Sequence, residues 1–300
     1  MFGSLVVPVD LSPASARVVR RAALLPLAEG ARLTLLHVVP GSLPRRLQQR
    51  ARGDAKKALA ERAKDLLRQL PPKAEVEVVV VAGSPAGEIA EHARTLEAEL
   101  VVLGRGGRTL RDVFLGSTAE RVLRRTQVPV LVVRLAPRAP YRRPALALDL
   151  DRAARAVIDL LLRVVAPPRP IIDVIHAYDS PYLQSSYPSL STSELEAYGK
   201  KHEKEALRRI QMLLAGSIVR GRLAPSDAPS FRTHVRPGAP RKIIEHAVEK
   251  NATDLLALGT HGYTGLERAF LGTVAGDVLR AVTCDVLMVP PPPEADETPR

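Results

Sequence analysis

Short apolar runs recur along the chain, and stretches with helical periodicity separate them. The runs are rich in Val, Leu and Ile and hardly alternate with polar residues, which is typical of strands covered on both faces of a sheet. Strands that alternate with helices predict an α/β fold with a parallel sheet. Runs of this kind occupy residues 4–10, 33–38, 128–133, 145–149, 171–177, 254–258 and 284–289.

The same series of motifs occurs twice, about 140–155 residues apart, which indicates one architecture used twice. Each copy opens with an apolar run that ends in Asp and continues to a second run with His near its end. A Gly-x-Pro motif follows, then a glycine 21 residues after the first one, then a closing apolar strand. The corresponding segments are 4–10 and 145–149, 33–38 and 171–177, 83–85 and 238–240, Gly104 and Gly259, and 128–133 and 284–289.

The repeat and the proline content predict the domain boundaries. We expect a first domain at 1–136, a proline-rich linker at 137–144, a second domain at 145–290 and a disordered tail at 291–300. Proline marks the starts of helices: Pro13 just inside the first, and Pro85 and Pro240 at the third of each copy.

Two longer segments, 40–53 and 178–191, interrupt the alternation, each after a second strand. We expect loops there. A lid over a ligand is the alternative, because both leave the carboxyl end of a strand, where open α/β sheets bind ligands.

The composition is that of a folded chain, with 46% hydrophobic and 25% charged residues. No run approaches the roughly 20 apolar residues of a membrane-spanning helix, and the N-terminus does not resemble a signal peptide, so we expect a cytoplasmic protein and no membrane partner. The single cysteine, Cys284, excludes an intrachain disulfide framework and a cysteine-rich zinc site.

The net charge of +12 suggests an acidic partner, and the excess lies mostly in the first copy. Residues 1–140 carry 23 Lys and Arg against 13 Asp and Glu, whereas residues 141–300 carry 21 against 19. Aromatic residues are only 3% and Trp is absent, so a stacking platform for single-stranded nucleic acid is not expected.

The loop after strand 254–258 has the features of a phosphate cradle. It reads Gly259-Thr260-His261-Gly262, nine residues, then Gly272-Thr273 at the start of a helix. Glycines let the backbone approach an anion, and a helix N-terminus offers unpaired N–H groups. Asp149 ends a strand that neighbours this loop in a doubly wound sheet, so its carboxylate can accept hydrogen bonds from a ribose. Neither the P-loop nor the dinucleotide pattern is present, which removes the main support for a kinase or a dehydrogenase.

The spacing G-x-x-G-x9-G-[ST] resembles the nucleotide loop of the universal stress protein family. The Asp-ended first strand, the LTLLHV strand, the G-x-P motif and the VPVLVV strand also resemble that family, over about 270 of the 300 residues. The resemblance implies two tandem Rossmann-like domains of the adenine nucleotide α-hydrolase-like type. Each would be a five-stranded parallel sheet in the order 3-2-1-4-5, flanked by helices. It also implies ATP as ligand, usually with magnesium.

Carried over residue by residue, the resemblance implies a nucleotide site in each half. In the second half it puts the base and ribose against Ala147, Leu148, Asp149, Ala177 and Leu258, and the phosphates against Gly259, His261, Gly262, Gly272, Thr273 and Val274. In the first half the matching positions are Pro8, Val9, Asp10, Val38, Leu103, Gly104, Gly107, Gly116, Ser117 and Thr118.

The first half departs from the family's loop, since eight residues instead of nine separate Gly107 from Gly116. The sequence therefore favours the second half as the better ATP site, with occupancy of both left open. The segment from Asp10 to Pro13 is nevertheless nearer the family's first-strand pattern than residues 149–152. Arg105, Arg108 and Arg111 lie beside the shorter loop and are interpreted as compensation for it.

The remaining candidate residues have structural interpretations. His37 and His176 end strands in both copies, and we expect packing or a backbone hydrogen bond there. We interpret His261 as a non-catalytic loop residue and Cys284 as a small, partly buried hydrophobic residue. No triad or metal-ligand spacing can be assembled, so no catalytic residue and no metal ligand is predicted.

The closing strands predict a partner surface, because an apolar edge strand needs a cover. Single-domain members of the resembled family dimerise through this strand, so in a tandem chain we expect an internal pseudo-dimer, with a homodimer left open. The predicted function is a nucleotide-dependent regulator in the stress response that acts on a protein partner without dedicated catalysis. The alternatives are a slow ATPase and a basic surface that binds nucleic acid or an acidic partner, of which nucleic acid is disfavoured.

Overall fold

The computed structural model describes residues 1–106, 117–151, 153–178, 191–260 and 271–292. The first half consists of β1 (Phe2–Pro8), α1 (Ser15–Ala23), β2 (Leu27–Pro40), α2 (Arg45–Leu67), β3 (Glu75–Gly83), α3 (Pro85–Thr95), β4 (Leu100–Gly104), α4 (Ser117–Arg125) and β5 (Val130–Val133). The second half consists of β6 (Pro144–Ala147), α5 (Ala154–Val164), β7 (Ile172–Tyr178), α7 (Thr192–Arg220), β8 (Phe231–Pro237), α8 (Pro240–Lys250), β9 (Leu255–Gly259), α9 (Thr273–Ala281) and β10 (Asp285–Val289).

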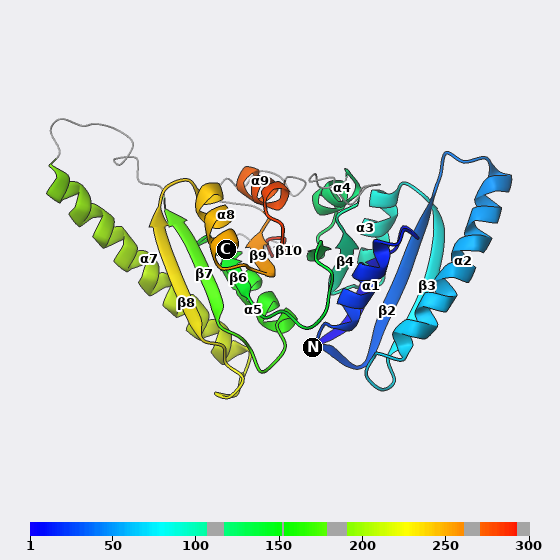
Figure 1. Ribbon diagram of the computed structural model, residues 1–300, viewed down its shortest axis with the longest axis horizontal. Coiled ribbons are helices and arrows are strands. Elements are labelled where there is room, and N and C mark those ends of the chain that lie inside the picture. The colour runs from blue at the N-terminus through cyan, green and yellow to red at the C-terminus, as the bar shows by residue number, and fades with distance from the viewer. Residues whose placement is uncertain (107–116, 152, 179–190, 261–270, 293–300) are drawn as a thin grey trace, which may run out of the picture.

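All ten strands of the described residues form one sheet, in the order β3-β2-β1-β4-β5-β10-β9-β6-β7-β8. Within each half the strands are parallel and follow the order 3-2-1-4-5, as predicted. The two halves lie side by side in one molecule (Figure 1) and meet where β5 and β10 pair antiparallel. Leu131 is opposite Leu287 in this pairing. The predicted internal pseudo-dimer through the closing strands is therefore present.

Helices cover both faces of the sheet, which explains why its inner strands read as continuous apolar runs. One core contains Leu131 and Leu287 with residues of α1, α2, α5 and α7, and the other contains Val132 and Val286 with residues of α3, α4, α8 and α9. Successive strand residues point to opposite faces. Both cores therefore continue across the junction between the halves.

A buried polar cluster anchors the linker at this junction. The Asp285 carboxylate accepts hydrogen bonds from the backbone N–H groups of Arg134 and Leu135 at 2.7 and 2.8 Å and from the Tyr141 hydroxyl at 2.7 Å. Arg21 lies 3.3 Å from the same carboxylate and stacks on the Tyr141 ring. Burial, together with the negative charge of Asp285, raises the pKa of Tyr141, so the hydroxyl keeps the proton that it donates. Residues from both halves thus share one buried carboxylate.

The loop predicted at 40–53 is wrong from residue 45 onward, because α2 begins at Arg45. Gly53 lies inside this helix and lowers its intrinsic stability by about 1 kcal/mol. Packing against the sheet outweighs that cost, since one stripe of the helix is buried at Ala55, Leu59, Ala63 and Leu66. Of the second predicted loop, residues 179–190 lie outside the described residues.

The helix starts marked by proline are confirmed at α3 and α8, which begin with Pro85 and Pro240. Pro13, in contrast, lies two residues before α1, in a turn where the Ala16 N–H donates to the Pro13 carbonyl at 3.3 Å. Among the described residues, no helix is long and apolar enough to cross a membrane.

Candidate functional site

Each half holds a cavity where the carboxyl ends of its first and fourth strands meet. The first cavity, at the ends of β1 and β4, has a volume of about 1090 Å³. The second, at the ends of β6 and β9, has a volume of about 370 Å³. In each half the second strand lies on one side of the first strand and the fourth strand lies on the other. Both cavities are therefore at the switch point of the strand order, where open α/β sheets bind ligands.

Most predicted first-half residues line the first cavity. Gly107 and Gly116 lie outside the described residues, and Ser117 is the first residue of α4, with no description of its side chain. The predicted residues that line the cavity are Pro8, Val9, Asp10, Val38, Leu103, Gly104 and Thr118.

The second cavity likewise gathers the predicted second-half residues. His261 and Gly262 lie outside the described residues. The predicted residues that line this cavity are Ala147, Leu148, Asp149, Ala177, Leu258, Gly259, Gly272, Thr273 and Val274.

In the first half, a tight turn orients the carboxylate at the end of the first strand. Asp10 Oδ1 accepts hydrogen bonds from the Ser12 N–H at 3.0 Å and from the Ser12 hydroxyl at 2.6 Å. Arg62 of α2 holds the turn from outside by donating to the Leu11 carbonyl at 3.3 Å. Asp10 Oδ2 accepts no hydrogen bond from a described residue, so it remains available to a hydroxyl in the cavity.

In the second half, Asp151 replaces the serine of this turn. Asp151 Oδ1 accepts hydrogen bonds from the N–H groups of Ala153 and Ala154 at 2.9 and 3.1 Å, at the start of α5. Burial, and then the nearby negative charge of Asp149, raise the pKa of Asp151. Arg209 of α7 donates to the Leu150 carbonyl at 2.9 Å, as Arg62 does to Leu11. In both halves an arginine of the following long helix holds the turn, but the second half has one more carboxylate in it.

The two strand-end histidines have the structural role expected for them. His37 Nδ1 lies 2.6 Å from the Val9 carbonyl oxygen, and His176 Nδ1 lies 2.8 Å from that of Leu148. Because a carbonyl only accepts, Nδ1 carries the proton in both rings. Each histidine therefore ties the end of the second strand to that of the first.

The two cavities differ in charge. Four arginines and one carboxylate, Asp10, line the first cavity, whereas two carboxylates, Asp149 and Asp151, line the second without any Lys or Arg among its described lining residues. The formal charge of the described lining residues is therefore about +3 in the first cavity and −2 in the second, with His neutral. The four arginines are Arg17, Arg105, Arg134 and Arg280.

The second half contributes part of the first cavity's wall. Residues 280–283, at the end of α9, line it, and Arg134 of the first half donates hydrogen bonds to the carbonyls of Leu279 and Val282 in that helix end. The sequence pattern did not point to Arg134 or Arg280, because only the pairing of β5 with β10 brings these segments together. Of the arginines interpreted as compensation, Arg105 lines the cavity, and Arg108 and Arg111 lie outside the described residues.

Within the described part of the chain, neither a reactive thiol nor a cluster of metal-ligand side chains is present. Cys284 is buried, and burial raises its pKa to about 12, so it packs as a hydrophobic residue. No group of three or more His, Cys, Asp or Glu side chains among the described residues is arranged to hold a metal ion.

Comparison with known proteins identifies relatives of both halves. The sequence profile of the universal stress protein family matches residues 1–134 and again 140–290. Universal stress protein A homolog 1 of Coxiella burnetii is 29% identical over 151 residues, which cover 50% of this chain and 96% of the relative. Universal stress protein YxiE of Bacillus subtilis is 31% identical over 150 residues, which cover 45% of this chain and 100% of the relative.

Solved structures match the whole chain. A universal stress protein from Archaeoglobus fulgidus superposes with a TM-score of 0.65 at 19% identity and covers 97% of both chains. One assigned as a universal stress protein from Pseudomonas aeruginosa also superposes with a TM-score of 0.65 at 19% identity, and covers 97% of this chain and 94% of that one. At such identities the likeness shows the fold, including its two-domain arrangement.

Proposed function

The chain belongs to the universal stress protein family, which supports a role in the stress response, and from this premise we propose that it binds an adenine nucleotide in its first cavity. The ligand we propose is ATP with magnesium. Its occupancy would be reported to a protein partner, without dedicated catalysis by this chain.

The charge of the first cavity is the observation that carries this proposal. A polyphosphate needs cationic donors, and arginine pairs with phosphate through two parallel N–H groups. Four arginines line the first cavity and none lines the second within the described residues. The volumes agree with this difference, since ligand cavities span roughly 300–1,000 Å³, and the first lies slightly above that range whereas the second lies near its lower end.

The groups in the first cavity fit the parts of a nucleotide. Apolar side chains such as Val9 and Val38 suit a base, and the free Asp10 Oδ2 suits ribose hydroxyls. The N-terminal turn of α4 and Arg105 suit the phosphates, because Arg105 has no side-chain hydrogen bond or ion pair with another described residue.

A further positive charge and the metal are consistent with the same ligand. Arg134 lines the first cavity and adds a positive charge to its wall, while its Nη groups donate to the carbonyls of Leu279 and Val282. Asp10 is the one carboxylate among the described lining residues of the first cavity. Magnesium would therefore be held chiefly by the nucleotide's own phosphates, and it would supply charge neutralisation there.

This preference for the first half differs from the one drawn from loop length. A second carboxylate opposes an anionic ligand, since two like charges roughly 8 Å apart repel by about 2 kcal/mol at an effective dielectric constant of about 20. Asp151 places such a charge in the second cavity, where the first half has Ser12. In choosing between the two halves as the ATP site, we therefore give the charge of the cavity wall more weight than the length of the glycine loop.

The position of the first cavity supports a regulatory role. Its wall comes from both halves, so a ligand that contacts both favours one arrangement of the junction over another. A partner that contacts the surface near α4 and α9 could then distinguish the bound chain from the free one. Beside Asp10, the described lining residues include no second carboxylate, and His37 is held by its Nδ1 hydrogen bond to the Val9 carbonyl.

Calorimetric titration of the purified full chain with ATP, GTP and adenosine tests the proposal. Binding of ATP in preference to GTP, with adenine nucleotide copurifying from the cell, is the expected result. No binding of any adenine nucleotide at millimolar concentration would remove the proposed function.

A further inference from the structure

One helix joins the two cavities. The first residues of α9, Thr273 and Val274, line the second cavity, and Arg280 and Ala281 at its end line the first. At a rise of about 1.5 Å per residue, the nine residues of α9 span about 13 Å. The second half therefore reaches into the first half's cavity with the end of a helix that begins at its own.

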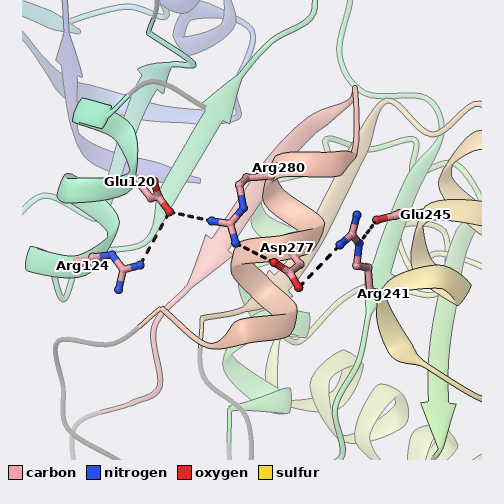
Figure 2. Close-up of polar contacts among 6 residues, drawn as sticks. All are labelled: Glu120, Arg124, Arg241, Glu245, Asp277 and Arg280. Atoms are coloured by element: carbon pink, nitrogen blue, oxygen red, sulfur yellow. Dashed lines mark hydrogen bonds and ion pairs between the residues drawn. The ribbon is translucent and has the colours of Figure 1, made fainter. Parts of the chain in front are cut away.

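Arg280 is the charged residue at the end of α9, and it forms an ion pair with one carboxylate of each half. Its Nη1 donates to Glu120 Oε1 of α4 at 2.9 Å, and its Nη2 donates to Asp277 Oδ1 of α9 at 2.7 Å (Figure 2). Glu120 also lies 3.8 Å from Arg124. The Arg280 side chain is 43% exposed, so it is anchored by these two carboxylates and not by burial.

Glu120 lies in the first turn of α4, the helix whose N-terminus borders the first cavity at Thr118. A guanidinium paired with Glu120 is therefore within about one helical turn of the N–H groups that attract an anion to that N-terminus. Arg280 has five N–H donors and uses two of them in its contacts with Glu120 and Asp277.

We propose that Arg280 is a phosphate ligand that the second half supplies to the first cavity, and that it leaves Glu120 for the ligand's anionic oxygens on binding. The inference rests on the proposed nucleotide site and names a residue of it. Exposed ion pairs contribute little to stability, so Glu120 holds Arg280 weakly. A guanidinium and a phosphate, in contrast, form a strong bidentate hydrogen-bonded pair. Asp277 keeps the arginine in reach during the exchange.

This exchange would transmit occupancy from one half to the other. Glu120 and Arg280 belong to a series of contacts that continues from Asp277 to Arg241 at 4.0 Å and from Arg241 to Glu245 at 2.6 Å, across α4, α9 and α8 (Figure 2). Loss of the Glu120 contact frees α4 from α9 at this point. A ligand in the first cavity thereby changes a contact between the halves.

Calorimetry of the full chain with three probes, ATP, inorganic tripolyphosphate and adenosine, tests the inference. Arg280→Ala is expected to weaken ATP and tripolyphosphate about tenfold or more, as expected for a lost charge-assisted contact, and to leave adenosine unchanged. Glu120→Gln is expected to strengthen ATP binding severalfold, because Arg280 no longer has a competing carboxylate. Arg241→Ala is the matched control: it removes the same charge from the same series of ion pairs but lines neither cavity, and we expect less than a twofold change.

Four outcomes separate the inference from the proposed function. Unchanged ATP affinity in Arg280→Ala, or a loss equal to that of Arg241→Ala, overturns the inference and leaves the nucleotide function intact. Equal losses of adenosine and ATP show a structural role for Arg280 and also overturn it. Wild-type binding of tripolyphosphate without ATP removes the nucleotide function, and Arg280→Ala must still weaken tripolyphosphate for the inference to stand. Binding of no probe by the wild type overturns both.

Discussion

In the first half, the hydroxyl of Ser12 donates to Asp10, whereas the second half has Asp151 at the same place in the turn, where burial and then the negative charge of Asp149 raise the pKa of Asp151. The supporting contacts are the same in both halves, with Arg62 and Arg209 bound to the carbonyl after the first aspartate. The strand order is also the same. The buried apolar residues thus maintain the same fold in both halves, while a few residues give the two cavities opposite formal charge.

The outer strands show a second difference. In the second half, Asp173 of β7 is buried and accepts hydrogen bonds from Arg232 at 2.6 Å and His234 at 2.9 Å on β8. The equivalent position of the first half is the buried Thr34, which is opposite Glu77 in the sheet. Burial raises the pKa of Asp173, but the hydrogen bonds from Arg232 and His234 more than offset it, so the pKa is lowered overall. Only the second half thus depends on an ionised carboxylate at this place.

Replacement of Asp285 by Asn is expected to have the largest effect, because it disrupts the buried polar cluster that joins the two halves. Arg21 would stay buried without its counter-charge, which costs about 3–5 kcal/mol of unfolding free energy. Urea unfolding measures this loss. Asp159→Asn, which removes a half-exposed partner of Arg220, is the control and should cost less than about 1 kcal/mol. Equal losses in the two variants would show that the buried cluster does not hold the junction.

The Ser12→Asp variant gives the turn of the first cavity the same two carboxylates that the second has at Asp149 and Asp151. We expect ATP affinity to fall about thirtyfold, the equivalent of about 2 kcal/mol of added repulsion. Titration calorimetry measures it, with Ser12→Asn as a control of the same size without the charge. If Asn weakens binding as much as Asp, the shape of the turn and not its charge separates the two halves.

The reverse change, Asp151→Ser, is expected to improve the second cavity by less, about tenfold. It removes the extra carboxylate, but serine is a less complete substitute for the hydrogen bonds to Ala153 and Ala154. The gain is best measured in an Asp10→Ala background, where the first site is disabled. A second cavity that still binds no ATP would show that its smaller volume, and not Asp151, excludes the nucleotide.

The smallest expected effect is a difference in pH dependence. Acidification should destabilise β7 and β8 of the second half before β2 and β3 of the first. The lowered pKa means that Asp173 stabilises the folded state while it is ionised, above its ordinary value near 3.8, and that this contribution is lost as pH falls through the lower, folded-state pKa. Hydrogen exchange between pH 7 and pH 3 should show β7 and β8 losing protection relative to β2 and β3. The Asp173→Asn variant should abolish this difference, and a difference that persists would contradict the assignment.

Much of the fold could be predicted from the sequence because strands buried on both faces read as apolar runs and the repeat shows them twice. The start of α2 could not be predicted, because the Arg-rich segment before Gly53 has no apolar stripe of its own. The buried residues that stabilise this helix lie further along it, from Ala55 onward. The charge of the first cavity could not either. Arg280 lies 175 residues from Arg105 along the chain, and it enters the cavity only through the pairing of β5 with β10.

Calorimetric titration of ATP into Asp10→Ala and Asp149→Ala variants of the full chain tests the central claim most directly. The two substitutions are equivalent by the repeat and remove the corresponding carboxylate from each cavity. We predict one ATP per wild-type chain, loss of that binding in Asp10→Ala, and its retention in Asp149→Ala. Loss of binding in Asp149→Ala with retention in Asp10→Ala, or two equal sites in the wild type, would contradict the account.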